Sequence, residues 1–389
     1  KDLKIIPKHI FGGIPAANLK LSKYNLEPVG NGPYKFKNFS SKKDGFITAF
    51  TLIPNPLYHD QQPYIKEIVF KFYRNEINLI KDFNLKKVSG VGGLNPESLK
   101  NLQISHKLFN LHLPRYYAIF FNGNLNSNLK ELEVRQALAL ATDKKQIIKK
   151  VFDDYASLAN GPLPSNLQGY DEKVYGQNTG FSLTKASEIL EKAGWQINQE
   201  DKVRYKTVVS GKGKNKKETK FKLEFEVIIP QIPFLLKTVN IIKEDWEKIG
   251  VKLNQTVLKI DEVNREILKT RNYQILLFGN ILKNNPDIYA FWHSSEKLHP
   301  GLNLALYENK TIDGLLEKLR QEINPQTRPE SLTKLQEIIH QEVPALFLFN
   351  PNYLYATTNN LKGFNTSFIS TPAHRFENIN QWHLKTKRA

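Results

Sequence analysis

Cysteine and methionine are both absent from the 389-residue chain. Without cysteine the protein cannot form disulfides, bind a metal through thiolates or use a cysteine nucleophile. The lack of cysteine also fits a protein that works outside the cytoplasm, where oxidising conditions prevail. The chain starts at Lys1, Asp2 and Leu3, without the charged and apolar regions of a signal peptide. We therefore expect a processed chain or a fragment.

Long hydrophobic runs are missing as well. The longest, Tyr116–Phe121 and Ala345–Phe349, are far shorter than the roughly 18 residues that a membrane-spanning helix needs, which excludes such a helix. Hydrophobic residues make up 40% of the sequence and charged residues 24%, as in ordinary globular proteins, which excludes a disordered or fibrous chain. The length predicts about two to three domains.

Arginine is scarce, although the chain is strongly basic. Lysine and arginine total 56 against 38 acidic residues, a net charge of +18, and only ten of the 56 are arginine. Nucleic-acid readers gather basic residues on one face, whereas these lysines occur in every segment. We interpret the densest run as a solvated hairpin loop; it comprises Lys212, Lys214, Lys216, Lys217 and Lys220. A nucleic-acid-binding protein stays an alternative, which would show a steep dependence of affinity on salt.

The motifs of common enzymes are absent too. The sequence contains no Gly-rich phosphate loop ending in Lys-Ser/Thr, no His-Glu-x-x-His and no Gly-x-Ser-x-Gly. His293 and His299 stand in a predicted loop without an evident third metal ligand. We therefore predict no catalytic residue, no metal and no cofactor. A hydrolase is an alternative only if its nucleophile and base come from distant segments.

Two kinds of local pattern divide the chain. Alternating apolar residues, as in 46–53, predict strands before residue 120, and helical patterns dominate from Leu129. Gly194 closes a helix at Ser182–Ala193, and a helical stripe ending in Trp246 and Ile249 is expected to pack on a sheet with Trp246 buried. Helices that alternate with strands in the second half predict an α/β lobe around a central sheet. Later elements are predicted as helices at 312–323 and 330–342 and a strand at 345–349.

The segment most typical of a binding site follows a predicted strand at 273–278. The strand ends at Gly279, where a backbone can approach a ligand, and a polar loop and then aromatic residues follow. In open α/β sheets ligands bind beyond the carboxyl ends of the strands, so we expect a site here. The alternative is that Phe291 and Trp292 belong to the core of the lobe.

Short motifs recur along the chain in the order known from one family. The early ones are Ile6-Pro7-Lys8-His9, Gly30-Asn31-Gly32-Pro33-Tyr34, Asn55-Pro56-Leu57-Tyr58 and Phe121-Asn122. The later ones are 134–138 with Thr142-Asp143, Gly161-Pro162-Leu163-Pro164, Ala193-Gly194-Trp195, 246–251, Pro286-Asp287 with 291–294, and Asn303 to Tyr307 with Asn309. In this order, from residue 6 to about residue 350, they resemble the extracellular solute-binding proteins of family 5, the oligopeptide- and dipeptide-binding receptors of ABC importers.

The resemblance implies an α/β protein with the two-lobed, class II fold of periplasmic binding proteins. Residues 1–121 would form lobe I, residues 122–350 lobe II, and residues 351–389 would return to lobe I. The amino-terminal segment of the family, with its small extra subdomain, has no counterpart here, so lobe I would be incomplete. The two crossings would act as a hinge, formed by Asn122, Gly123, Asn350 and Pro351.

The resemblance also implies a ligand in a cleft between the lobes, where the protein satisfies a peptide backbone and leaves hydrated pockets for its side chains. We expect this cleft to be lined by Gly279, Asn280, Lys283, Asn284, Trp292, Asn303 and Tyr307. Peptide-binding members usually carry, after a Gly-Trp pair, an aspartate that pairs with the α-amino group of the ligand. Here Asn280 stands in place of the tryptophan and Lys283 in place of the aspartate. Another small polar solute is therefore the alternative to a peptide.

The expected partners follow from the same resemblance. They are a peptide or small polar ligand and the permease subunits of an ABC importer, but no nucleic acid. We expect a monomeric lipoprotein in the periplasm or on the outer face of the cell membrane, attached to the membrane only by an anchor.

Overall fold

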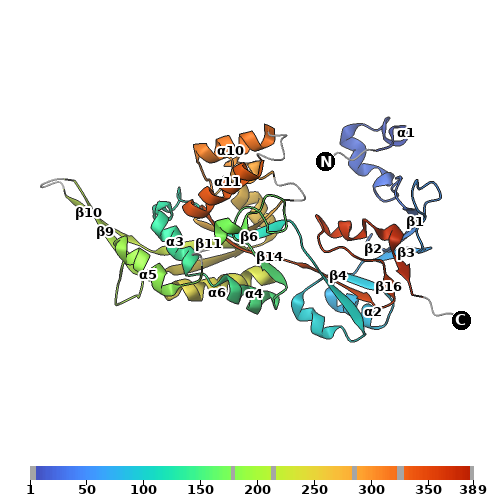
Figure 1. The fold of residues 1–389 in the computed structure, drawn as a ribbon, viewed down its shortest axis with the longest axis horizontal. Helices are drawn as coiled ribbons and strands as arrows, with labels where there is room; N and C mark the ends of the chain where they lie inside the picture. Colours follow the sequence, from blue (N-terminus) through green and yellow to red (C-terminus); the bar gives the residue numbers. More distant parts are fainter. Residues whose placement is uncertain (1–5, 177–179, 212–215, 283–286, 322–327, 386–389) are drawn as a thin grey trace. The chain divides into compact units, whose positions relative to one another are not determined.

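The computed structural model describes residues 6–176, 180–211, 216–282, 287–321 and 328–385 (Figure 1). The chain forms two compact units, of which unit 1 comprises residues 1–111 and 353–389 and unit 2 comprises residues 112–352. Within the described ranges no helix is long and apolar enough to cross a membrane.

Unit 1 contains two antiparallel sheets of three strands. In the first sheet β1 (Tyr34–Ser41), β2 (Ile47–Pro54) and β3 (Ile68–Lys71) pair in chain order. In the second, β15 (Tyr353–Thr358) lies between β4 (Gly90–Leu94) and β5 (His106–Leu111). The segment after residue 352 thus completes a sheet that earlier residues begin. Unit 1 also contains short 3-10 helices, the helices α1 (Lys8–Phe11) and α2 (Glu76–Asn84), and the paired strands β16 (Leu361–Lys362) and β17 (His383–Leu384).

Unit 2 is built on a mixed sheet of six strands in the order β12-β11-β13-β6-β14-β7. β11, β12 and β13 are parallel, whereas β6 runs antiparallel to both of its neighbours, β13 and β14. The strands are β6 (Arg115–Phe121), β7 (Ala156–Leu158), β11 (Glu224–Pro230), β12 (Lys252–Leu258), β13 (Ile275–Ile281) and β14 (Ala345–Pro351). The predicted α/β lobe with a central sheet is confirmed.

Helices cover both faces of this sheet, so its strands are apolar on both sides (Figure 1). Ile119 and Phe121 share one core with α3 (Leu132–Leu140), α4 (Lys144–Phe152), α5 (Leu183–Lys192) and α6 (Pro233–Glu247). On the opposite face Phe347 contacts Tyr116 and the Trp292 ring of α9 (Tyr289–Trp292). The other helices are α7 (Ile260–Glu262), a π-turn at Val263–Ile267, α8 (Leu268–Thr270), α10 (Lys310–Gln321) and α11 (Arg328–Glu342).

Helix α6 shows how local sequence sets the ends of an element. It begins at Pro233, whose ring fits the first helical position, and Gly250 with φ +77° turns the chain into β12. Its stripe packs into the core, and Trp246 is completely buried. The Trp246 Nε1 donates to Leu138 O at 3.1 Å and to Thr142 Oγ1 at 2.9 Å. The predicted burial of Trp246 is confirmed.

The predicted lysine-rich hairpin is also present. β9 (Arg204–Ser210) and β10 (Lys217–Lys222) pair antiparallel, and β8 (Gln196–Ile197) adds a third strand. Lys217 and Lys220 are exposed on this hairpin, whereas Lys212 and Lys214 lie outside the described residues. The exposed lysines therefore contact solvent on a surface hairpin.

The division into units differs from the boundary predicted at residues 121 and 122. It falls between Leu111 and His112, because Arg115–Phe121 is the central strand β6 of the unit 2 sheet. On the return, the division falls between Asn352 and Tyr353, two residues after the predicted boundary at residues 350 and 351. A continuous apolar strand could be assigned to either lobe from sequence, and only its hydrogen-bonding partners decide the assignment.

Candidate ligand-binding site

The carboxyl ends of several strands meet at one edge of the unit 2 sheet. Because β11, β12 and β13 are parallel, their carboxyl ends at Pro230, Leu258 and Ile281 lie at the same edge, with β13 extending beyond the other two. The antiparallel β6 begins at this edge with Arg115, which is the register partner of Ile281. β14 also ends here, so both covalent connections to unit 1 leave the sheet at this edge.

Two cavities of unit 2 lie at this edge and share the residues Phe278–Ile281. The larger, of about 370 Å³, is also lined by Arg271, Phe291 and His299. The smaller, of about 180 Å³, is lined by Arg115, Tyr117 and residues of α6 and its preceding turn. Both cavities carry an arginine, and none of the described residues that line them is acidic. Gly279 and Asn280, both predicted to contact the ligand, thus line cavities at this edge of the sheet.

Arg115 was missed by sequence reasoning, although an arginine at the start of an apolar strand was a usable signal. One of its terminal nitrogens donates to Pro351 O at 3.0 Å. Its Nε is buried and has no hydrogen-bond partner within the described residues. Burial lowers the pKa of the Arg115 guanidinium. An unsatisfied, partly desolvated guanidinium beside a cavity is suited to bind an anionic group.

Asn280 is almost fully buried and contacts Tyr116, a second residue that sequence reasoning missed. The Asn280 Nδ2 donates to the Tyr116 hydroxyl at 2.9 Å. Burial raises the pKa of Tyr116, while its contacts with Asn280 and Trp292 act in the opposite direction. Trp292 is completely buried. The Tyr116 hydroxyl thus fixes the Asn280 amide at the end of β13, and Trp292 does not line the two cavities.

Gly279 is required for a packing reason. A Cβ atom at this position would come within 2.8 Å of the Tyr117 ring on the paired strand β6. Tyr117 in turn stacks on Phe349, with ring centroids 5.7 Å apart. The glycine therefore makes room for an aromatic ring of the protein itself.

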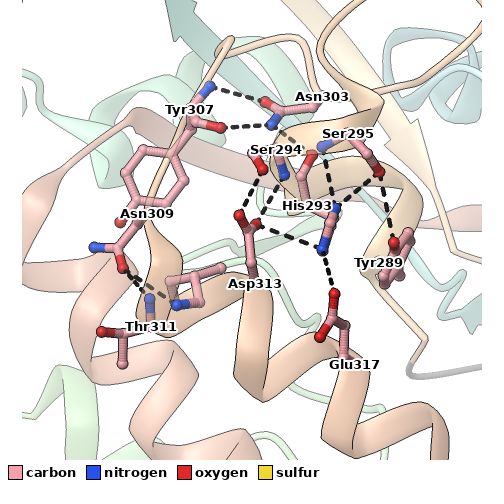
Figure 2. A network of polar contacts seen from close by, with 11 residues as sticks. Tyr289, His293, Ser294, Ser295, Asn303, Tyr307, Asn309, Thr311, Asp313 and Glu317 are labelled. Carbon is pink, nitrogen blue, oxygen red and sulfur yellow. Dashed lines mark hydrogen bonds and ion pairs between the residues drawn. The ribbon is translucent and has the colours of Figure 1, made fainter.

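Asn303 and Tyr307 form the framework of the loop that follows α9 (Figure 2). The fully buried Asn303 donates through Nδ2 to His293 O at 3.1 Å and Tyr307 O at 2.9 Å, and its Oδ1 accepts from the Tyr307 N–H. The Tyr307 hydroxyl donates to Glu342 Oε2 at 2.6 Å. Neither residue lines the two cavities at the sheet edge.

His293 belongs to the same framework. Its Nδ1 accepts from the Ser295 N–H at 3.1 Å, and its ring stacks on Tyr289 at a centroid distance of 4.1 Å. The Nε2 lies 3.4 Å from Glu317 and 3.8 Å from Asp313, whose carboxylate also accepts from the Ser294 N–H (Figure 2). Within the described part of the chain no three His, Asp or Glu residues are placed to hold a metal. His293 thus orients the turn between α9 and α10.

The predicted hinge residues all lie in unit 2. Asn122 donates through Nδ2 to Arg271 O at 3.0 Å, and Gly123 packs against Lys130, away from the crossing. Asn350 is buried and donates to Leu113 O at 2.6 Å, and Pro351 is next to the second crossing. Lys283 and Asn284, which we predicted to contact the ligand, lie outside the described residues.

Comparison with known proteins agrees with this architecture. The chain is 25% identical over 388 residues to the oligopeptide-binding protein AppA of Bacillus subtilis, which covers 98% of this chain and 66% of the relative. The structure of that protein in complex with a nonapeptide matches with a TM-score of 0.70 and 23% identity, over 98% of this chain and 72% of the other. NikZ of Campylobacter jejuni in complex with Ni(L-His) matches with a TM-score of 0.70 and 23% identity, over 97% and 72%.

These likenesses define the class of the fold, which is that of the two-lobed periplasmic binding proteins. Residues 2–299 match the model of the bacterial extracellular solute-binding proteins, family 5 Middle, so the chain belongs to this family. The family consists of solute-binding proteins and not of enzymes. The chain spans about two thirds of the length of the curated relatives that it matches, 66% and 62% for the first two.

Proposed function

We propose that the protein is the substrate-binding receptor of an ABC importer and that it captures peptides at the carboxyl edge of the unit 2 sheet. The observation that carries this proposal is the pair of cavities around Phe278–Ile281. They lie at the edge from which both connections to unit 1 leave, and ligands of α/β sheets bind at this edge. The two connections are the proposed hinge, together with the adjacent Asn350 and Pro351.

The chemistry of the edge supports a ligand with an anionic group. Arg115 supplies an N–H without a partner among the described residues, and Arg271 adds a second cation. The Arg271 guanidinium is already used, because it donates to Lys297 O at 2.8 Å and Gly301 O at 2.6 Å. We therefore assign Arg115 to the ligand, where it would meet a carboxylate such as the C-terminus of a peptide. Asn280 and the loop residues Lys283 and Asn284 complete the proposed contacts, while Trp292, Asn303 and Tyr307 hold the loop.

A small polar solute is the second candidate. The related structure of NikZ contains Ni(L-His), and that protein matches this chain as well as the nonapeptide complex does. In addition, no acidic side chain among the described lining residues is available for a peptide α-amino group. A ligand without a free amino group, or one that brings its own metal, fits these walls.

The location and partners are part of the same proposal. We infer that the protein works outside the cytoplasm, as a monomer that delivers its ligand to permease subunits, and that any membrane attachment comes from a lipid anchor. Nucleic acid is not a partner in this proposal, because the exposed lysines of the β9–β10 hairpin suit solvation better than base recognition.

Native mass spectrometry of the gently purified protein tests the ligand class. We expect a bound peptide that is released on denaturation, and its mass identifies the length. Isothermal titration with that peptide should then show weaker binding to Arg115→Met than to the wild type, by about ten- to a hundredfold, the range for a charged hydrogen bond. A co-purified non-peptide solute would support the second candidate, and nucleic acid as the bound species would overturn both.

A further inference from the structure

A third cavity, of about 540 Å³, lies inside unit 2 and takes no part in the proposed receptor site. This open pocket is lined by residues of α3, α4, α5, α11, the turn at Glu172–Tyr175, the loop around Asn160 and the first residues of β14. β7 pairs only with Phe349–Pro351, so this strand does not cover the edge of β14 beside Ala345–Phe347. The volume falls in the range of about 300–1,000 Å³ that is typical of small-molecule sites.

The walls of this cavity are apolar with a basic end. Side chains that remain half-buried line it from α3, α5 and the turn before β14, namely Ala139, Leu140, Ile189 and Val343. Lys144, Lys173 and His340 supply nitrogen groups, and none of the described lining residues is acidic. An apolar wall with an unbalanced cation is complementary to an organic anion with an apolar body.

Lys144 is the cation that is best placed for such a ligand. Its Nζ donates to Asn160 Oδ1 at 3.0 Å and to Ala159 O at 3.2 Å, which fixes the ammonium at the wall and uses two of its three donors. Two acidic residues next to the lining residues in the sequence are engaged elsewhere: Asp143 caps α4 through the Gln146 N–H, and Glu342 accepts from Tyr307 and Asn309. Desolvation lowers the pKa of Lys144 to about 8, as expected for an ammonium that lacks a carboxylate partner.

We propose that this cavity binds a small amphipathic carboxylate, such as a medium-chain fatty acid, with the carboxylate on Lys144 and the apolar chain against α3 and α5. His340 lies at the cavity wall with its ring edge-on to Tyr175, and burial, followed by the charge of Lys144, lowers its pKa. The histidine is therefore neutral at neutral pH and can donate a hydrogen bond to the ligand. This site is separate from the receptor site, so a second solute could be bound without occupying the sheet edge.

Isothermal titration of the full chain with octanoate tests this proposal, with octanol and acetate as probes for each half of the ligand. We expect saturable binding of octanoate, weaker binding of octanol and no measurable binding of acetate. Lys144→Met should weaken octanoate by about ten- to a hundredfold, as for the loss of a charged hydrogen bond. Lys145→Met, an exposed neighbour on α4, is the matched control and should leave the affinity unchanged.

Ile189→Trp is a second variant, which fills the cavity without changing its charge and should abolish octanoate binding. Circular dichroism checks that each variant is folded. If Lys144→Met does not fold, octanoate binding to the Ile189→Trp variant tests the proposal. Absence of octanoate binding to the wild type, or unchanged affinity in a folded Lys144→Met or Ile189→Trp variant, would overturn the proposal.

Discussion

At the scale of single residues, the polar side chains that look most like ligand contacts in the sequence are used to build the site. Asn303 makes three hydrogen bonds with His293 and Tyr307. The Asn280 Nδ2 donates to Tyr116, although Asn280 still lines both cavities. Buried amides must find partners, and here the protein itself supplies them. Arg115 differs from them, because its Nε keeps a donor without a partner in the described residues. Arg115 is assigned to the ligand because its unpartnered donor belongs to a residue that lines a cavity.

Replacement of Trp246 tests the packing of the unit 2 core. Trp246→Ala should lower the free energy of unfolding by about 3–5 kcal/mol, because it empties a fully buried site and leaves Thr142 Oγ1 without its donor. Urea denaturation of the variant and of Val257→Ala, an exposed control on β12, provides the comparison. A loss below about 1 kcal/mol for Trp246→Ala would contradict the packing described here.

Lys144 makes the stability of the protein depend on pH. Its folded pKa of about 8 is below its ordinary value of 10.5, so the unfolded chain binds more protons between these two values. Stability from this group is therefore fully present above pH 10.5 and is lost as the pH falls to 8. Relative to the wild type, Lys144→Met should gain about 1–3 kcal/mol below pH 8, with the gain fading by pH 10.5. A constant difference from pH 7 to pH 10.5 in denaturation experiments would disprove this.

Replacement of Lys283 tests whether the site prefers a peptide with a blocked or a free N-terminus. By spacing from Gly279, we predict that Lys283 takes the position of the amine-binding aspartate of the family. Two like charges in a cleft repel each other. We predict that the wild type prefers N-acetylated over free peptides, and that Lys283→Asp reverses this preference. Thermal shifts can measure it, because ligand at about 100 times its Kd adds roughly 2.7 kcal/mol of stability. Equal preferences in both proteins would mean that Lys283 does not meet the ligand.

At the scale of elements, Arg204 joins the ends of two helices. Its buried guanidinium donates to Trp195 O after α5 and to Ile249 O after α6, both at 2.8 Å, and to Glu191 Oε1 at 3.0 Å. Both carbonyls belong to the turns that follow the helices, so this buried side chain satisfies backbone groups of two turns at once. One residue of the β9 strand thus connects the turn after α5 with the turn after α6.

Replacement of Arg204 measures this connection. Arg204→Met should cost about 2–4 kcal/mol, because two carbonyl groups lose their donor. Arg204→Lys should recover only part of the loss, since an ammonium cannot span three acceptors as a planar guanidinium does. The exposed Arg265→Met is the control, and an Arg204→Met variant as stable as this control would show that water replaces the guanidinium without cost.

At the scale of the whole molecule, only two connections join the units, at residues 111–112 and 352–353. Receptors with this construction close around the ligand by small changes in such connections. We predict that the co-purified ligand, added back to ligand-free protein, reduces the radius of gyration in small-angle scattering. A solute that does not bind in titration serves as the control. An unchanged profile at saturation would argue against a two-lobe trap.

The sequence by itself was sufficient to predict many of the helices and strands and to identify the family. The α6 stripe, Gly250 after it and the serine cap of α5 act over a few residues, so their effects can be read from spacing. The order of short motifs identified the family in the same way, because it needs only positions along the chain. The strand predicted at 273–278 is present as β13, but it continues through Gly279 to Ile281 because these residues pair with β6.

Only the tertiary structure decided which side chains meet. The strand Arg115–Phe121 was predicted to belong to lobe I and lies in unit 2, because an apolar strand carries no mark of its neighbours in a sheet. The strand β6, with Arg115 and Tyr116, and the strand β13, with Asn280, are distant in the chain. Tyr116 contacts Asn280 only because of the register in which these strands pair. The cavity around Lys144 likewise depends on how α3, α5 and α11 pack. Local patterns set where elements begin and end, whereas hydrogen-bonding register and packing, which depend on the whole chain, set the site.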